Sequence, residues 1–225
     1  MFEMSNNEII TTVDCCLESL CREFSTTSSL FFTERDLICR LYSELYAKLG
    51  NYRIEGSDGR SHLLIHTEYS VPFKGRMGDG NFREVTDHER GGRGKYDLVV
   101  LNPAAIKGHT YPEINCQSYP IAKETIIRWS NANNAPIVLY GIEFGFRRKP
   151  LTHKDNSIDW NLCNRYLRSV RQDFDKLRAG VIKGYIGKIK TIFFIGSGPK
   201  EAIEYIRNEL PKDPDAMVCC GELHT

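Results

Sequence analysis

The stretch Gly94-Lys95-Tyr96-Asp97-Leu98-Val99-Val100-Leu101 decides the fold and locates the chemistry. Its apolar, β-branched residues predict a strand that is buried in a sheet. A second stretch of the same kind is Ile137-Val138-Leu139-Tyr140-Gly141-Ile142-Glu143-Phe144. Each contains one carboxylate, Asp97 in the first and Glu143 in the second. An unpaired carboxylate is costly to bury or becomes protonated, so two of them on separate buried strands indicate a shared cation.

The length of 225 residues suits one large domain with a substantial core. We expect a single domain over 1–225, with a core from about 34 to 195, an N-terminal helical extension over 1–30, and a C-terminal helix and tail over 196–225. The 30 basic residues are balanced by 29 acidic ones, so any site for a polyanion has to be local.

The eight cysteines include no Cys-x-x-Cys pair with the spacing of zinc ligands. We interpret them as reduced thiols of a cytoplasmic protein. The N-terminus has no basic segment followed by an apolar run, and no window approaches the roughly 20 apolar residues that span a bilayer. We therefore expect a soluble protein that does not enter a membrane.

The spacing of apolar residues predicts the secondary structure along the chain. Helices are expected over about 7–24, 34–49, 122–130, 158–179 and 200–210, and strands over about 61–72, 94–101, 137–144 and 190–195. Thr33 is the expected N-cap of the helix 34–49, and Gly180 is expected to close the helix 158–179. The glycine-rich connection 73–94 is either a segment that meets phosphates or a solvated loop.

The order of these elements predicts an α/β fold with a central mixed β-sheet flanked by helices. Apart from the short helix before the third strand, the order is helix, strand, strand, strand, helix, strand. This order and the two strand-borne acids resemble the core of the restriction-endonuclease-like superfamily, the PD-(D/E)xK phosphodiesterases. The resemblance covers roughly residues 34 to 195. It rests on residues 93–100 and on Gly141-Ile142-Glu143-Phe144-Gly145, with Asp173-Phe174-Asp175-Lys176-Leu177 as weaker support.

The resemblance implies a metal-dependent endonuclease that hydrolyses DNA, of which restriction enzymes are one kind. It implies that Asp97 and Glu143 hold Mg²⁺ or Mn²⁺, and that Glu44, or else Glu34, completes the shell or orients a metal-bound water. A duplex-cutting homodimer is also an expectation from the resemblance. The ion makes physical sense, because Mg²⁺ prefers carboxylate, water and phosphate oxygens and would neutralise charge on the scissile phosphate.

Gly145 departs from the superfamily pattern, which normally has a lysine two residues after the second acid. A glycine has no side chain to position or activate water. The candidates for a replacement cation are Lys95, which strand alternation places on the face of Asp97, then Lys176, then Arg147. Arginine is too basic to act as a general base. The loss of the lysine favours an alternative, in which the fold serves as a nucleic-acid-binding or protein-interaction module without catalysis.

Six basic side chains are expected to contact backbone phosphates, which gives affinity without sequence choice. They are Lys74, Arg76, Arg93, Arg147, Arg148 and Lys149.

The acidic and histidine residues also have structural interpretations. Asp97 could pair with Arg93 or Lys95, and Glu143 with Arg147, as ordinary ion pairs. Glu68 is as well explained by an edge position or a salt bridge as by metal binding. His62 and His66 are four residues apart on a predicted strand, so their rings stand roughly 13 Å apart and are not expected to share a metal.

Overall fold

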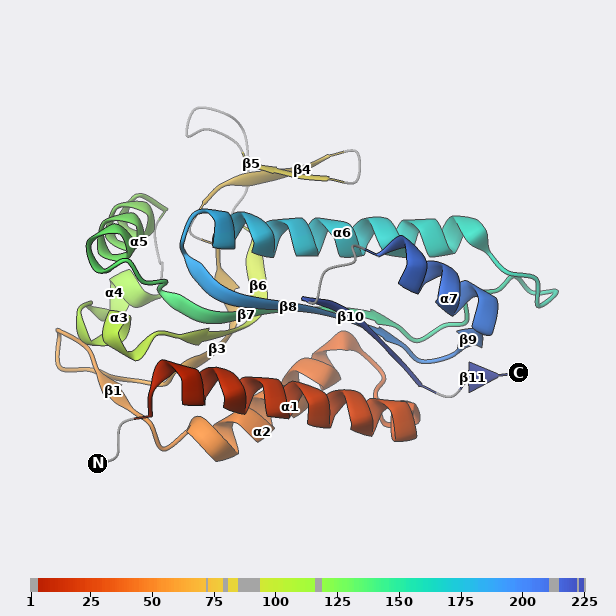
Figure 1. Cartoon of the computed structure of the whole chain (residues 1–225), viewed down its shortest axis with the longest axis horizontal. Helices are drawn as coiled ribbons and strands as arrows, with labels where there is room; N and C mark the ends of the chain where they lie inside the picture. Colours follow the sequence, from red (N-terminus) through yellow and green to blue (C-terminus); the bar gives the residue numbers. More distant parts are fainter. Residues whose placement is uncertain are drawn as a thin grey trace.

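A five-stranded mixed sheet forms the centre of the protein, with helices on both of its faces (Figure 1). The computed structural model describes residues 4–71, 73–78, 81–84, 94–115, 119–210, 215–221 and 223–224. The strand order is β10-β8-β7-β6-β3. These strands are β3 (Ile65–Ser70), β6 (Lys95–Leu101), β7 (Val138–Arg147), β8 (Ile186–Ile195) and β10 (Ala216–Cys220). Neighbours from β3 to β7 are antiparallel and those from β7 to β10 are parallel. The predicted α/β fold with a central mixed sheet is confirmed.

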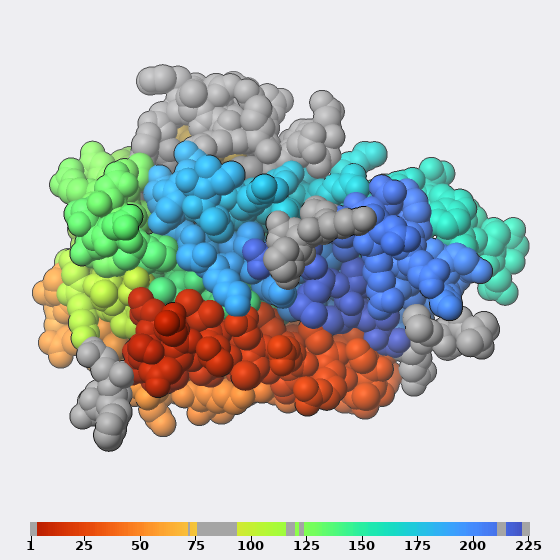
Figure 2. Space-filling model, in the orientation of Figure 1, coloured from red at the N-terminus to blue at the C-terminus, as the bar shows by residue number. Residues whose placement is uncertain are grey.

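Two helical layers enclose this sheet (Figure 1). Helices α1 (Asn6–Thr27) and α2 (Glu34–Leu49) cover one face, and α6 (Trp160–Ile182) with α7 (Lys200–Glu209) covers the other. The short helices α3 (Pro103–Lys107) and α4 (Tyr111–Ile114) gather with α5 (Tyr119–Asn133) at one end. Figure 2 shows the red atoms of α1 along one side of the molecule and the turquoise to blue atoms of α6 and α7 along the other.

Helix α1 belongs to the main core, although the sequence suggested an N-terminal extension. Its buried residues Val13, Leu20 and Phe24 lie in the same apolar cluster as the sheet. The ring of Phe24 lies 4.8 Å from that of Phe194 on β8. Helix α1 also contacts β10, where Cys21 raises the pKa of the Cys219 thiol. The first helix and a strand near the end of the chain therefore pack together.

The ends of α2 and α6 show how local sequence sets helix boundaries. Thr33 caps α2 as predicted, because its hydroxyl accepts from the Asp36 N–H. Helix α6 passes through Gly180 and ends at Ile182, so the predicted stop is wrong. A Cβ at Gly180 would lie 2.6 Å from Cδ1 of Ile186, so this glycine permits close packing inside the helix rather than ending it.

The remaining strands are short, and the sequence pattern did not predict them as separate elements. The predicted strand 61–72 is divided into β2 (Ser61–His62), which pairs with β1 (Ile54–Glu55), and β3. The glycine-rich connection contains the hairpin of β4 (Gly75–Gly78) and β5 (Asn81–Glu84), which lies beside α6 (Figure 1). The C-terminal tail contains β10 as well as β11 (Leu223–His224), which pairs with β9 (Gly198–Pro199). A 3₁₀ turn, η1 (Ser28–Leu30), follows α1.

Two further observations bear on the expected location. Every cysteine that the structure describes is a free thiol, and Cys116 lies outside the described residues. Within the described part of the chain, no helix combines the length and the apolar character needed to cross a bilayer.

Candidate functional site

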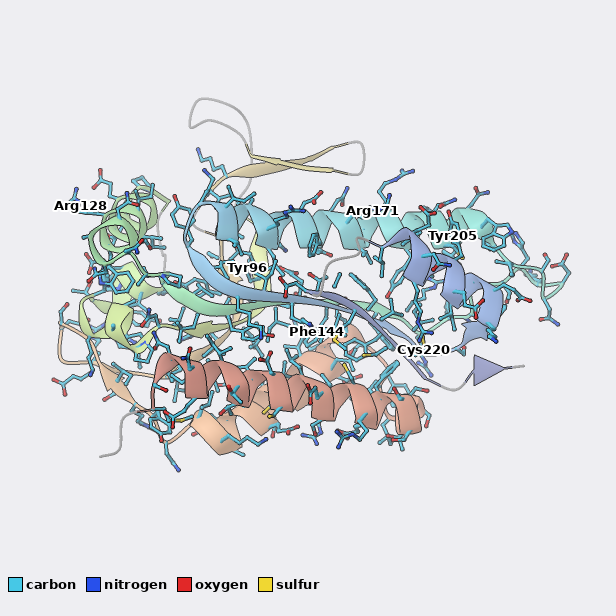
Figure 3. All side chains as sticks on the ribbon, viewed as in Figure 1. Tyr96, Arg128, Phe144, Arg171, Tyr205 and Cys220 are labelled. Atoms are coloured by element: carbon cyan, nitrogen blue, oxygen red, sulfur yellow. The ribbon has the colours of Figure 1, made fainter. Side chains whose placement is uncertain are left out.

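Asp97 and Glu143 face each other across the antiparallel strands β6 and β7. Leu98 pairs with Ile142 in this register, which places Asp97 opposite Glu143. Asp97 Oδ2 accepts a hydrogen bond from the Phe144 N–H at 2.7 Å, and each of the two acids affects the pKa of the other. Tyr96 and Phe144, which adjoin the two acids in the chain, are labelled in Figure 3. The structure therefore brings the two predicted acids together.

Lys176 of α6 supplies the cation at this pair. Its Nζ lies 2.6 Å from Glu143 Oε1 and 3.6 Å from Asp173 Oδ1, and it donates to the Lys95 carbonyl at 2.7 Å. The side chains of Lys176 and Glu143 are only 8% and 3% exposed. The ion pair is close, but it is not aligned as a hydrogen bond. Glu143 thus pairs with Lys176 and not with Arg147.

Two further acids, Glu34 and Asp173, border the pair. Glu34 lies in the first turn of α2, and the Phe146 N–H acts to lower its pKa, while Asp173 lies one turn before Lys176. Burial, reinforced by Asp97 and Asp173, raises the pKa of Glu34 to about 7. Burial also raises the pKa of Asp173 to about 6, although Lys176 acts to lower it. We call Glu34, Asp97, Glu143, Asp173 and Lys176 the carboxylate–lysine cluster.

Negative charge exceeds positive charge in the carboxylate–lysine cluster. Burial raises the pKa of Asp97, while the Phe144 N–H and Lys176 act to lower it. Burial raises the pKa of Glu143 well above its ordinary value, and Lys176 opposes this while Asp97 adds to it. The ammonium of Lys176 is therefore the counter-ion shared by several carboxyl groups of the cluster. A divalent cation with oxygen ligands fits this imbalance, because it would favour the ionised form of both strand acids.

The space beside Gly145 explains why the strand has no lysine there. A Cβ at this position would lie 3.0 Å from Cδ1 of Phe193 and 3.5 Å from the Tyr166 hydroxyl. That hydroxyl also donates to the Gly145 carbonyl at 3.2 Å. A side chain at position 145 would thus press on Phe193, and the lysine that lies at Glu143 comes from α6.

Lys95, the first candidate for the replacement cation, points to a different acid. Its side chain is 57% exposed, and its Nζ lies 3.3 Å from Glu68 Oε2. Glu68 also lies 3.9 Å from Arg35, and its backbone has a positive φ of 53°. The structure does not bring Lys95 to Glu143. Glu68 makes the salt bridge that was one of its two interpretations.

Glu44 lies away from the carboxylate–lysine cluster. It pairs with Arg40 at 3.5 Å and with Lys48 at 3.4 Å on its own helix. It follows Glu34 by ten residues, which is about 15 Å along the axis of α2. The structure therefore places Glu34, the alternative acid from this helix, beside Asp97 in its stead.

The predicted phosphate-binding residues are only partly described. Arg93 and the side chain of Arg76 lie outside the described residues. Lys74 and Arg147 are half-buried, whereas Arg148 and Lys149 are exposed just after β7. The guanidinium of Arg148 lies 4.7 Å from the ring centroid of Phe32.

The two histidines of the divided strand line a pocket of about 150 Å³ together with Glu68 and Tyr111. His66 Nε2 lies 3.0 Å from the Leu63 carbonyl, and the His62 ring stacks on Tyr111. Among the described residues, no group of three or more histidine, cysteine, aspartate or glutamate side chains is arranged to hold a metal ion. Any ion at Asp97 and Glu143 would therefore take its other ligands from water and substrate, as Mg²⁺ commonly does.

Comparisons with protein-family models, with curated proteins and with solved structures found no match. The geometry of the carboxylate–lysine cluster is therefore the basis for the functional proposal. Asp173 and Lys176 belong to the weaker sequence pattern, and their i, i+3 spacing on one helix was the signal that could have ranked Lys176 first.

Proposed function

We propose that this protein is a metal-dependent endonuclease that hydrolyses DNA phosphodiester bonds. The observation that carries the proposal is that two strand-borne acids, Asp97 and Glu143, lie opposite each other on β6 and β7, with a buried lysine 2.6 Å from the second acid. The order α2, β3, β6, β7, α6, β8 agrees with the core of the restriction-endonuclease-like superfamily, leaving aside the hairpin and the short helices. The fold assignment to that superfamily is part of the proposal.

Asp97 and Glu143 would hold Mg²⁺ or Mn²⁺ through carboxylate oxygens. Mg²⁺ typically takes one or two protein carboxylates and completes its shell with water and substrate phosphate. When bound, such an ion lowers the pKa of a water molecule and neutralises charge on the phosphate. The raised pKa values of both acids, caused first by burial, are consistent with a site that gains from an added cation.

Lys176 would act as a charged hydrogen-bond donor. Burial acts to lower its pKa, but Glu143 and Asp173 outweigh burial and the pKa is raised, so the amine stays protonated. Asp173 and the Lys95 carbonyl hold the ammonium in place. An ammonium has three donors, and its two close partners are Glu143 at 2.6 Å and the Lys95 carbonyl at 2.7 Å, so one donor would serve a phosphate oxygen or the attacking water. Glu34, whose pKa burial raises to about 7, would accept a hydrogen bond from that water.

A second candidate function is nucleic-acid binding without cleavage. The burial of Glu143, whose side chain is 3% exposed against Lys176, favours it, because this acid already has a counter-ion. The cytoplasmic location, the DNA partner and the homodimer are expectations that belong to the same proposal.

The test is incubation of supercoiled plasmid with the protein and Mg²⁺ or Mn²⁺. Wild type is expected to nick or linearise the plasmid. Asp97→Asn and Lys176→Met are expected to lower the rate at least about 100-fold, as loss of a group that stabilises transition-state charge does. Glu44→Gln is the matched control, because it removes a carboxylate from α2 outside the cluster. Equal rates for wild type and Asp97→Asn would refute the proposal, and DNA binding without cleavage would favour the second candidate.

A further inference from the structure

Phe32 and Arg148 form an exposed stack next to the carboxylate–lysine cluster. The guanidinium carbon of Arg148 lies 4.7 Å from the Phe32 ring centroid, and Phe32 is 58% exposed. Phe32 precedes Glu34 by two residues, and Arg148 follows Glu143 by five, or roughly 17 Å along an extended strand. The stack thus joins the two elements that carry Glu34 and Glu143.

Contacts of the neighbouring residues and of the backbone fix the segment around Phe32, so its exposed ring is not needed to hold that segment in place. The N–H groups of Phe32 and Thr33 both donate to Asp36 Oδ2 at 2.8 Å. The preceding ring, Phe31, is 5% exposed and packs 5.6 Å from Phe24 in the core. The segment is therefore anchored on both sides of Phe32, and an exposed ring adds little to the stability of the fold.

Basic side chains flank the stack, while the Asp36 carboxylate is taken up by the Phe32 and Thr33 N–H groups. Arg148 and Lys149 are exposed at the end of β7, and the side chain of Arg35 is 77% exposed on α2. Proteins that bind single-stranded nucleic acids combine such cations with aromatic rings on which bases stack.

We propose that the Phe32–Arg148 stack binds an unpaired nucleobase of the substrate strand, so that the substrate has a single-stranded segment beside the cleaved bond. This inference rests on the proposed nuclease function and assigns its substrate class. The base stacks on the open side of the Phe32 ring, while Arg148 and Lys149 contact the adjoining phosphates. A base inside a duplex is already stacked on its neighbours, so it reaches the ring only after unstacking, which disfavours fully paired DNA.

The experiment measures binding by fluorescence anisotropy in the Asp97→Asn background, where cleavage is suppressed. The probes are labelled single-stranded DNA, single-stranded RNA and duplex DNA of one sequence. Phe32→Ala is expected to weaken single-strand binding about 5- to 150-fold, which is the worth of one base stack. Phe32→Tyr keeps a ring and is expected to bind as the parent does, and duplex binding is expected to stay unchanged. The matched control is Tyr46→Ala, which removes an exposed ring, 44% exposed, near the other end of α2.

Equal single-strand affinity of Phe32→Ala and its parent would overturn the inference, as would an equal loss for single strand and duplex. Phe32→Leu, which keeps apolar volume without a ring, gives the same comparison if the alanine variant does not fold. A matching loss for RNA and DNA supports the inference and assigns the base as the ligand. A loss of affinity for single-stranded DNA alone also supports the inference, and it indicates that the site contacts the sugar as well as the base. Supercoiled plasmid tests the nuclease proposal separately, because negative supercoiling opens unpaired stretches in the duplex. Cleavage of the plasmid needs Asp97 but not Phe32 binding to a single strand in the anisotropy comparison.

Discussion

Lys176 Nζ lies 2.6 Å from Glu143 Oε1, and this contact joins α6 to the centre of the sheet. The lysine is absent from β7, where Gly145 stands, and arrives instead from the following helix. A side chain can thus reach the same carboxylate from a different part of the chain. Each of the two charges depends on the other, because an uncompensated charge is costly to keep buried.

Lys176→Met is expected to lower the free energy of unfolding by about 3–5 kcal/mol, the usual cost of breaking a buried ion pair from one side. Adding Glu143→Gln should recover part of this loss, because the second substitution removes the uncompensated charge. Urea denaturation of the two single variants and the double variant in metal-free buffer completes the cycle. Strict additivity of the two losses would contradict a direct pair.

Lys176→Met is also expected to bind Mn²⁺ more tightly than wild type does. The ammonium and the ion compete for the carboxylate of Glu143, so removal of the ammonium favours the ion. Isothermal titration calorimetry checks the affinity, with Asp97→Asn in the same background as the control that should weaken binding. An unchanged or lower affinity in Lys176→Met would contradict the competition.

Gly145→Lys is expected to destabilise the protein by about 1–3 kcal/mol and to restore nothing to the site, because Phe193 and Tyr166 occupy the space. Gly198→Ala is the matched control, since the nearest atom to its Cβ would be 3.7 Å away. Thermal unfolding and plasmid cleavage together measure both effects. A gain in cleavage for Gly145→Lys would show that the two aromatic rings can move aside.

The metal-free protein is expected to lose stability as the pH rises from about 4.5 to about 7. The pKa of Glu34 is raised from 4.5 to about 7, and that of Asp173 from 3.8 to about 6, chiefly by burial. The folded state therefore binds more protons than the unfolded state in this window, and stability falls with rising pH. Glu34→Gln should flatten the melting temperature against pH in the presence of a chelator. An identical slope in the variant would contradict the assignment.

Thr33→Ala is expected to cost about 0.5–2 kcal/mol of stability and also to slow cleavage, because Thr33 caps the helix whose first residue is Glu34. Ser5→Ala is the matched control, since Ser5 forms the same kind of capping box with Glu8 at the start of α1. We expect a similar stability loss there with no change in cleavage rate. Cleavage is measured at a temperature where both variants are folded. Equal rates for the two variants would show that Glu34 has no part in the reaction.

The pairing of Asp97 with Glu143 could be predicted because each strand carries its own signal in a few consecutive residues. The choice between Glu34 and Glu44 could not be predicted, since both lie on one correctly predicted helix. Only packing decides which end of that helix lies near the last residues of β7. The reach of Lys176 depends on how α6 sits on the sheet, which no local pattern records. Strand β10 was not predicted. It pairs with β8 only after the chain has crossed over through α7, and this long-range pairing leaves no local signal.

Gly180 shows the same limit in the opposite direction. Its local meaning is a helix stop, but the approach of Ile186 requires a residue without a side chain inside α6. Long-range packing therefore overrode a local signal that is usually dependable.

Helix α1 packs against β10, so a single contact ties together two segments at opposite ends of the sequence. Closing a loop of that length carries a high entropic cost before any contact rewards it. The apolar stripe of α1 has no complete partner surface until β10 has joined β8. Fraying of either terminal segment is therefore expected to expose apolar surface on the other, so the two segments depend on each other for protection from solvent.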